Sequence, residues 1–403
     1  LQAHALLVAT SNAPVEISVE ARDGALKAHI EGGLIAGIPV AQLSTEEARD
    51  AAYDALVDRG LAAPRISTSD IDSSLAKMRF FDVYDEPSQA VTDAAAAALA
   101  ASQTRVAVSQ AADLGLDALS LASIYFLAAI GLAITFGVMG VINMAHGEFI
   151  MMGAYTGYVV QQFVPNHTAS ILIAVPLAFA VTFAAGVALE RLVVRWLYHR
   201  PLETLLATFG ISLILQQLVR TVISPQNRTV VSPDWLSGSV MINEGLSLTL
   251  NRLYVLGFAL IVFAGLMLIM RKTRLGLEVR AVTQNRAMAR SMGIRATRVD
   301  IMTFALGSGV AGLAGVALSQ LTNVGPNLGQ NYIIDSFMVV VFGGVGNLWG
   351  TLIAGLSLGT INQLLEPWAG AVLAKIIVLV FIILFIQKRP KGLFPQKGRA
   401  AEG

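Results

Sequence analysis

Long apolar runs dominate the chain from Ala118 onward, and each has roughly the 18 to 21 residues that a helix needs to cross a bilayer core of about 30 Å. Continuous apolar runs lack the alternation of a membrane barrel strand, so helices are expected. The sequence therefore predicts an all-α, polytopic α-helical membrane domain of about eight to nine spans. The predicted spans are residues 118–139, 147–164, 169–190, 204–223, 253–270, 300–321, 333–350, 352–366 and 371–387. The seventh and eighth are short and meet at Gly350, so they are either two crossings or a re-entrant pair.

Residues 1–112 have a polar pattern and are predicted to form a small soluble extension, mainly helical or α+β, before a membrane domain over residues 113–399. Val15–Glu20 alternates as a strand does. Ser44-Thr-Glu-Glu47 resembles a capping box before a helix, and the alanine-rich stretch 93–101 also favours helix. The chain starts with Leu rather than Met, as expected of a processed chain or a fragment.

Composition agrees with a chain that lies mostly in lipid. Hydrophobic residues make up 55% and charged residues 14% of the sequence, which excludes an ordinary soluble globular protein. The chain contains no cysteine, so disulfides and thiolate metal or redox sites are excluded. Acidic residues gather before Asp117 and basic residues after it, a division that gives no indication of nucleic-acid binding.

Basic residues predict the orientation, because Lys and Arg in short loops stay on the cytoplasmic side. Three loops or tails contain sixteen of them: Arg191, Arg195, Arg200, Arg271, Lys272, Arg274, Arg280, Arg286, Arg290, Arg295, Arg298, Lys388, Arg389, Lys391, Lys397 and Arg399. The opposite-side segments 165–168, 224–251 and 322–332 contain only Arg228. The extension is therefore predicted outside the cytoplasm and the C-terminus inside, in a bacterial inner membrane.

Enzyme signatures are absent from the sequence. It has no Gly-x4-Gly-Lys-Ser/Thr phosphate loop and no His-Glu-x-x-His motif, so it is not expected to hydrolyse ATP, to carry catalytic residues or to bind a cofactor or metal. The glycines of Gly343-Gly344-Val-Gly346 lie in an apolar run, where close helix packing explains them better than nucleotide binding.

The segment Val141-Ile-Asn-Met-Ala-His-Gly-Glu148 places Asn143, His146 and Glu148 between two apolar runs. Ionisable groups at membrane depth are candidates for a translocation pathway. The alternative is a surface loop whose side chains cap helix ends. His146 and Glu148 have no further ligands in the pattern that would complete a metal site.

Gly307, Ala311, Gly315 and Ser319 recur every four residues in the sixth run and predict a ridge for close helix packing. The ridge would form an interface around a translocation path or would serve ordinary packing within the chain.

Amide side chains follow this ridge and offer uncharged donors and acceptors to a polar solute. The candidates are Asn323, Asn327, Gln330 and Asn331, with Asn347 further along, although an ordinary outer loop has a similar composition.

The long basic loop 271–298 includes a short predicted surface helix from Gln284 to Met292, which Gly293 ends. A solvated basic loop beside anionic lipid is the alternative interpretation.

Four motifs together resemble the branched-chain amino-acid ABC permease family, and within it the urea-transporter permeases most. They are Gly131–Glu148, Arg280–Ile294, Phe342–Gly350 and Arg389–Phe394, and the resemblance covers residues 115–399.

The resemblance implies a heteromeric importer with a second permease, two cytoplasmic ATPases and a periplasmic solute-binding protein. It also implies that the basic loop is a coupling segment that docks on the ATPase. The residues concerned are Arg280, Asn285, Ala287, Ala289 and Gly293.

The predicted spans contain few charges, which favours a small neutral polar solute such as urea or a short amide. A branched-chain amino acid is the alternative, and it would need a partner for its charges. A passive urea channel and a membrane-anchored sensor are the other function classes. A channel would work without ATP, and a sensor would bind its ligand through residues 1–112.

Overall fold

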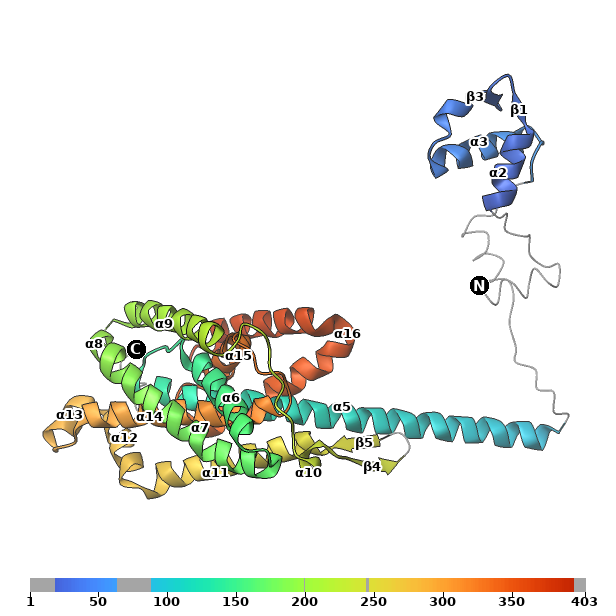
Figure 1. Ribbon diagram of the computed structural model, residues 1–403. Helices are drawn as coiled ribbons and strands as arrows, with labels where there is room; N and C mark the ends of the chain where they lie inside the picture. Colours follow the sequence, from blue (N-terminus) through green and yellow to red (C-terminus); the bar gives the residue numbers. More distant parts are fainter. Residues whose placement is uncertain (1–18, 64–87, 199, 244–245, 395–403) are drawn as a thin grey trace. The chain divides into compact units, whose positions relative to one another are not determined.

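The computed structural model describes residues 19–63, 88–198, 200–243 and 246–394 (Figure 1). The chain divides into two units, Leu1–Ala98 and Leu99–Gly403. Each unit is described by itself.

The first unit contains two helices, α2 (Val19–Ala28) and α3 (Glu46–Asp58), with the short 3-10 helix η1 (Val40–Gln42) before α3. Between α2 and η1 lie the antiparallel strands β1 (Ile30–Glu31), β2 (Leu34–Ile35) and β3 (Ile38–Pro39), in the order β1-β2-β3. A small core joins these elements and consists of Leu26, Ile35, Ala52, Tyr53 and Leu56.

The helix expected after residue 44 is present, but its N-cap is Thr45 rather than Ser44. The Thr45 side chain accepts a hydrogen bond from the Ala48 amide at 3.3 Å. The predicted strand Val15–Glu20 is wrong at Val19 and Glu20, which form the first turn of α2. An acidic residue such as Glu20 is favourable in a first helical turn, and the buried residues Arg22 and Leu26 are spaced four apart on one helix face. Residues 15–18 of that prediction lie outside the described residues.

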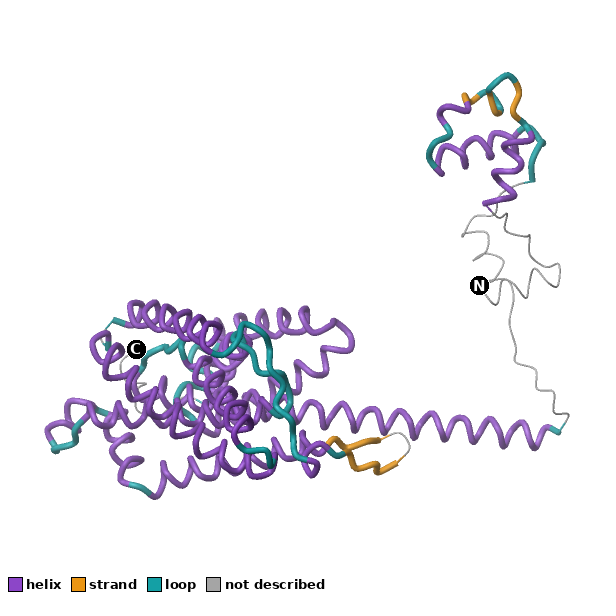
Figure 2. Tube along the Cα trace, in the orientation of Figure 1, coloured by secondary structure: helices purple, strands orange, loops and turns teal. Residues whose placement is uncertain are grey.

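The second unit is built from helices, and its named strands form one hairpin (Figure 2). In chain order its elements are α5 (Gln89–Met139, which begins in the first unit), α6 (His146–Phe163), α7 (His167–Leu189), the π-helical turn η2 (Glu190–Val194), α8 (Arg195–Leu197), α9 (Pro201–Val222), α10 (Asp234–Ser237), β4 (Ser239–Asn243), β5 (Leu246–Thr249), α11 (Leu250–Lys272), α12 (Arg274–Gln284), α13 (Arg286–Ser291), α14 (Ala296–Ser319), α15 (Leu328–Gly343) and α16 (Leu348–Lys388).

Six helices of the described chain are long and apolar enough to cross a membrane: α5, the run His167–Leu197, α9, α11, α14 and α16. The predicted fold class, an all-α polytopic membrane protein, is confirmed. The alanine-rich stretch 93–101 is helical as expected, because it forms the start of the 51-residue α5.

The last predicted spans differ from the structure in their boundaries. α15 ends at Gly343, and α16 begins at Leu348 rather than after Gly350. Gly344 and Gly346 between them have positive φ angles of 101° and 81°, which glycine adopts without strain, so the chain turns here. α16 then bends at Gly370 (φ 75°) into two arms, which correspond to the predicted spans 352–366 and 371–387.

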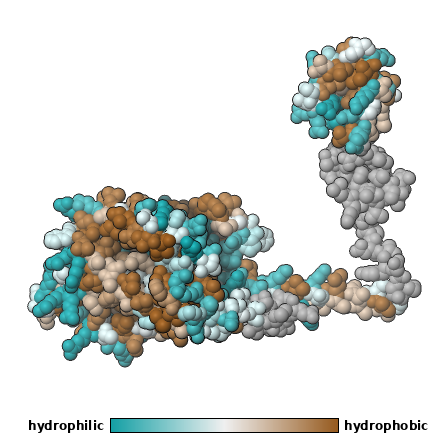
Figure 3. Space-filling view, in the orientation of Figure 1, coloured by the Kyte–Doolittle hydropathy of each residue, from teal (hydrophilic) through white to brown (hydrophobic). Residues whose placement is uncertain are grey.

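α14 lies at the centre of the bundle and packs closely on α5, α6 and α7 through small residues. A Cβ atom on Gly153 of α6 would lie 2.1 Å from the Gly312 carbonyl oxygen, and one on Gly131 of α5 would lie 2.3 Å from that of Gly307. The outer helices α7, α9, α11 and α16 expose large apolar side chains. These cover much of the visible face, whereas hydrophilic side chains lie mainly toward the two ends of the bundle (Figure 3).

The bundle has two chemically different ends. α8, α12 and α13 lie at one end, and α10 and the β4–β5 hairpin lie at the other (Figure 1). The C-terminal segment returns to the end that carries α13, where the Leu393 amide donates to the Phe342 carbonyl at 2.9 Å. The arginine-rich loop and the basic tail therefore share one end of the unit.

Candidate functional site

The turn between α5 and α6 is buried inside the bundle. Gly140 (φ 69°) follows the end of α5, and the Asn143 carbonyl oxygen Oδ1 accepts a hydrogen bond from the Ala145 amide at 3.0 Å. Asn143 is only 1% exposed, and its Nδ2 has no hydrogen-bond partner among the residues that the structure describes. This turn therefore places a spare amide donor inside the protein rather than at its surface.

His146 begins α6 and points toward α5. Its Nε2 lies 2.9 Å from the Ala128 carbonyl oxygen. A carbonyl oxygen can only accept, so Nε2 carries the proton in this bond. Gly131 makes room for the ring, because a Cβ there would lie 3.0 Å from the His146 Cε1 atom. The arrangement holds α6 against α5.

Glu148, half a turn further along α6, points toward α9. Its Oε1 atom accepts from the Ser212 hydroxyl and from the Gln216 Nε2, each at 2.7 Å. Its Oε2 atom is buried and has no hydrogen-bond partner in the described part of the chain, and the residue is 1% exposed. His146 and Glu148 thus contact different neighbours, and the structure does not bring them into one site.

Polar residues four apart form a stripe along α9, namely Thr204, Thr208, Ser212 and Gln216. These are four of the five buried residues of the helix, and the fifth is the apolar Val219. The opposite face exposes apolar side chains, including Leu206, Leu213 and Leu218. This stripe is absent from the residues predicted above, although the four-residue spacing of its polar groups within an apolar run is visible in the sequence.

Hydrogen bonds attach the stripe to the rest of the bundle. The Thr204 hydroxyl donates to the Leu197 carbonyl at 2.8 Å, and the Met144 amide donates to the Thr208 hydroxyl oxygen at 3.1 Å. One turn beyond Gln216, the Arg220 guanidinium donates to Asn327 Oδ1 at 2.7 Å. We call the set Thr204, Thr208, Ser212, Gln216 and Glu148 the α9 seam.

The predicted amide candidates lie at two different ends of the bundle. Asn323 accepts from the Thr229 hydroxyl at 3.1 Å, where α9 and α14 have both ended. Asn331 and Gln330 line a pocket at this end, together with Lys375. Asn347 instead caps α16 by accepting from the Gly350 amide at 3.1 Å, and it donates to the Phe394 carbonyl in the tail at 3.3 Å.

The small-residue ridge of α14 lies inside the bundle. Gly307 faces Gly131 and Thr135 of α5, whereas Gly315 faces the Ile150 carbonyl of α6. Ala311 and Ser319 are buried as well. The ridge therefore serves contacts within this unit.

The basic loop forms two helices, α12 and α13, rather than the single helix predicted from Gln284 to Met292. Asn285 breaks them, because its extended backbone and its side chain, which accepts from the Met288 amide at 2.9 Å, start a new helix. Gly293 (φ 82°) ends α13 as predicted. Arg280 of α12 donates to the Met270 carbonyl at the end of α11.

Within α13, Ala289 is buried against the bundle, whereas Ala287, Met288 and Met292 are exposed. Arg286 turns inward, forms an ion pair with Asp300 of α14 and lies over the Tyr198 ring at 4.3 Å. The exposed face of α13 is therefore free for a partner, and its inner face is fixed to α14.

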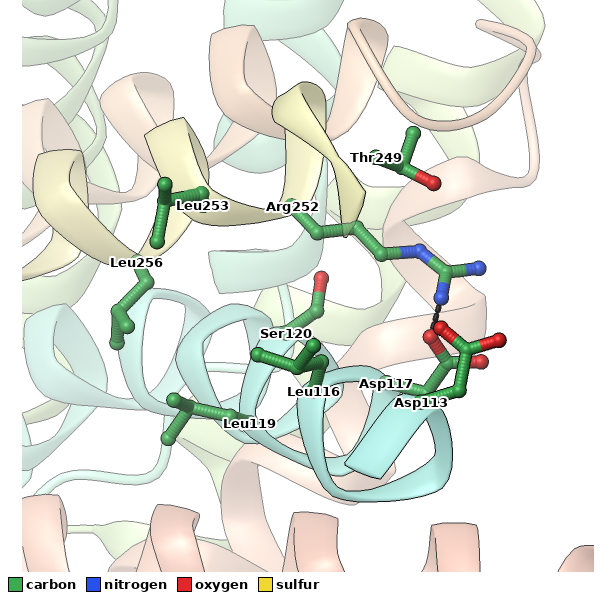
Figure 4. A pocket seen from close by; sticks show the side chains of 9 residues that line it. All are labelled: Asp113, Leu116, Asp117, Leu119, Ser120, Thr249, Arg252, Leu253 and Leu256. Carbon is green, nitrogen blue, oxygen red and sulfur yellow. Dashed lines mark ion pairs between the residues drawn. The ribbon is translucent and has the colours of Figure 1, made fainter. Parts of the chain in front are cut away.

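A second ion pair lies at the opposite end, between Asp117 of α5 and Arg252 of α11. Figure 4 shows both residues at a small pocket, with Asp113 beside them and leucines, Ser120 and Thr249 on the remaining wall. The pair joins two helices where they leave the apolar part of the bundle.

Residues 115–386 match the model of the family described as branched-chain amino acid transport system, permease component. The chain belongs to this family. It is thus a multi-pass membrane permease component of a transport system. The match begins in α5 and ends in the second arm of α16, so the seam and the basic loop both lie inside the matched region.

The permease is similar to the high-affinity branched-chain amino acid transport system permease protein LivH of Escherichia coli, with 28% identity over 288 residues, which are 69% of this chain and 93% of LivH. The similarity to BraD of Pseudomonas aeruginosa, a permease protein of the same description, is 28% over 69% of this chain and 93% of BraD. A probable branched-chain amino acid transport permease of Methanocaldococcus jannaschii is 27% identical over 66% of this chain and 87% of its own length. No solved structure matches the chain significantly.

Proposed function

We propose that this chain is the permease subunit of an ABC importer that carries a branched-chain amino acid into the cell. The observation that supports this most is the similarity that spans 93% of both LivH and BraD, whose names state this transport. Their resemblance to this chain is spread over the whole membrane unit and is not confined to one motif.

Energy comes from partner subunits in this proposal, because the sequence has no phosphate loop of its own. A cytoplasmic ATPase docks on the exposed face of α13, a second permease subunit completes the membrane part, and an external binding protein delivers the solute. The end that carries α13 and the basic tail faces the cytoplasm, as the distribution of Lys and Arg favours. The N-terminal unit then lies outside.

The buried Glu148 side chain bears on the identity of the solute. A scarcity of charge inside the spans favours a neutral molecule, but the Glu148 carboxylate is buried beside α9. A buried carboxylate offers a partner to an ammonium group, which an amino acid has and urea lacks. Urea remains the second candidate, because the motifs of the membrane unit resemble those of urea-transporter permeases.

Solute identity is tested by reconstituting the complete assembly, with both permeases, the ATPases and the binding protein, in vesicles. The proposal predicts ATP-driven uptake of labelled leucine that excess isoleucine or valine suppresses and excess urea does not. Uptake of labelled urea without uptake of leucine would contradict it and would support the second candidate.

A further inference from the structure

The carboxylate of Glu148 is only partly satisfied inside the bundle. Both neighbouring donors, Ser212 Oγ and Gln216 Nε2, bind the same oxygen, Oε1. The other oxygen, Oε2, is buried and has no hydrogen-bond partner among the described residues. A carboxylate is an acceptor with about four lone-pair sites, so this oxygen is open to a donor.

A carboxylate with an oxygen that lacks a donor destabilises the folded protein, because the effective free-energy penalty for burying an ion is several kcal/mol. A cation that binds to it lowers that cost. The nearest basic residue on the same face of α9 is Arg220, one turn beyond Gln216, but its guanidinium donates to Asn327, the N-cap residue of α15. Within the described structure, the seam itself supplies hydroxyl and amide groups but no cation for Oε2.

The stripe to which this site belongs runs along most of α9. From Thr204 to Arg220 the helix rises about 24 Å, most of the thickness of a bilayer core. Apolar packing usually attaches an outer helix to a bundle, but here polar residues make up most of the buried face of α9. A polar solute can exchange hydrogen bonds with such a face, whereas an apolar interface offers it none.

From this geometry we infer that Glu148, Ser212 and Gln216 form the site that holds the primary ammonium group of the solute during its passage along α9. The inference rests on the proposed import function and names the residues that recognise one end of the solute. The ammonium group donates to Glu148 Oε2 and supplies the positive charge that the seam itself does not offer to this carboxylate. Ser212 and Gln216 keep the carboxylate oriented through Oε1. Thr204 and Thr208 offer hydroxyl groups on the cytoplasmic half of the route.

The test uses the absence of native cysteine, so that Ser212→Cys places a single thiol in the seam. In the complete assembly, a small cationic thiol reagent should modify this cysteine, and saturating leucine should slow the modification at least tenfold. The oxo acid analogue of leucine, which has no ammonium group, should leave the rate unchanged at the same concentration. Leu213→Cys, on the exposed apolar face of α9, is the matched control, and leucine should not change its rate.

Glu148→Gln provides the second measurement, since it retains the shape and removes the charge. Leucine uptake by the assembly should fall at least tenfold. If Ser212→Cys fails to assemble, Thr208→Cys, one turn away on the same stripe, replaces it.

Equal modification of Ser212→Cys with and without leucine, together with wild-type uptake by Glu148→Gln, would overturn the inference. Equal protection by leucine and its oxo acid would also overturn it, because the ammonium group would then play no part. A wild-type assembly without ATP-driven leucine uptake would contradict the proposed function instead, so the two failures are distinguishable.

Discussion

Arg286 of α13 forms an ion pair with Asp300 in the second turn of α14. The Asp300 side chain is 5% exposed and the Arg286 side chain 25% exposed. Arg286 also donates to the Tyr198 hydroxyl at 2.5 Å and lies over its ring. Because α14 is the central helix of the bundle, this pair connects the surface helix proposed to dock on the ATPase directly to the membrane core.

Asp300→Ala is predicted to weaken coupling between solute and ATP hydrolysis. Removing one partner of a fully buried pair costs about 3–5 kcal/mol, and the cost is smaller here because Arg286 is partly exposed to water. The stimulation of ATPase activity by loaded binding protein should fall severalfold, while the assembly still forms. Stimulation at the wild-type level would contradict this role.

The control for this prediction is Arg200→Ala. Arg200 pairs with Glu203 at the same end of the bundle, but both side chains are more than half exposed. An exposed pair contributes roughly 0–1 kcal/mol, so stimulation should be unchanged.

Gly315→Ala is predicted to destabilise the membrane unit. The new Cβ would lie 2.0 Å from the Ile150 carbonyl oxygen, so the backbones of α14 and α6 would have to separate. Overpacking of this kind costs about 1–3 kcal/mol. Thermal unfolding of the detergent-solubilised protein should show a lower midpoint.

Gly265→Ala in α11 is the matched control, because nothing lies within 4 Å of its Cβ. Alanine has a higher helix propensity than glycine by about 1 kcal/mol, so this variant should have an equal or higher midpoint. An equal fall for both variants would mean that close packing of α14 on α6 is not the cause.

Membrane orientation can be measured with single cysteines in this cysteine-free chain. Ala287→Cys, on the exposed face of α13, should resist an impermeant thiol reagent added to intact cells and should react after the cells are opened. Gln330→Cys, exposed at the opposite end, should react in intact cells. The reverse pattern would invert the orientation and remove the docking role of α13.

The sequence predicted the elements that depend on local pattern. Apolar runs predicted the helices of the membrane unit. Gly293 predicted the end of α13, because a helix often ends at a residue with a positive φ angle and glycine adopts this angle without strain. Helix caps were predicted less well. Ser44 and Thr45 are chemically alike, so which of them caps α3 depends on backbone geometry that the sequence does not reveal. In the same way, Asn285 divides the predicted single helix into α12 and α13 through its backbone conformation.

The site depends on contacts between distant segments, which a single sequence does not display. Glu148 and Gln216 are 68 positions apart, and nothing in their local patterns states that they meet. Asn323 and Asn347 have similar local surroundings in sequence, yet they lie at opposite ends of the bundle because α15 runs between them. The α9 stripe differs from these contacts, because its four-residue spacing is visible in the sequence although it was not predicted.

The central claim is that transport through this permease requires ATP hydrolysis by partner subunits, and energy dependence tests it most directly. Vesicles containing the complete assembly and loaded binding protein should accumulate labelled leucine with ATP, and accumulation should stop with a non-hydrolysable ATP analogue. Equal uptake of leucine or urea by vesicles that contain the permease without any ATPase would contradict the account and would indicate a passive channel.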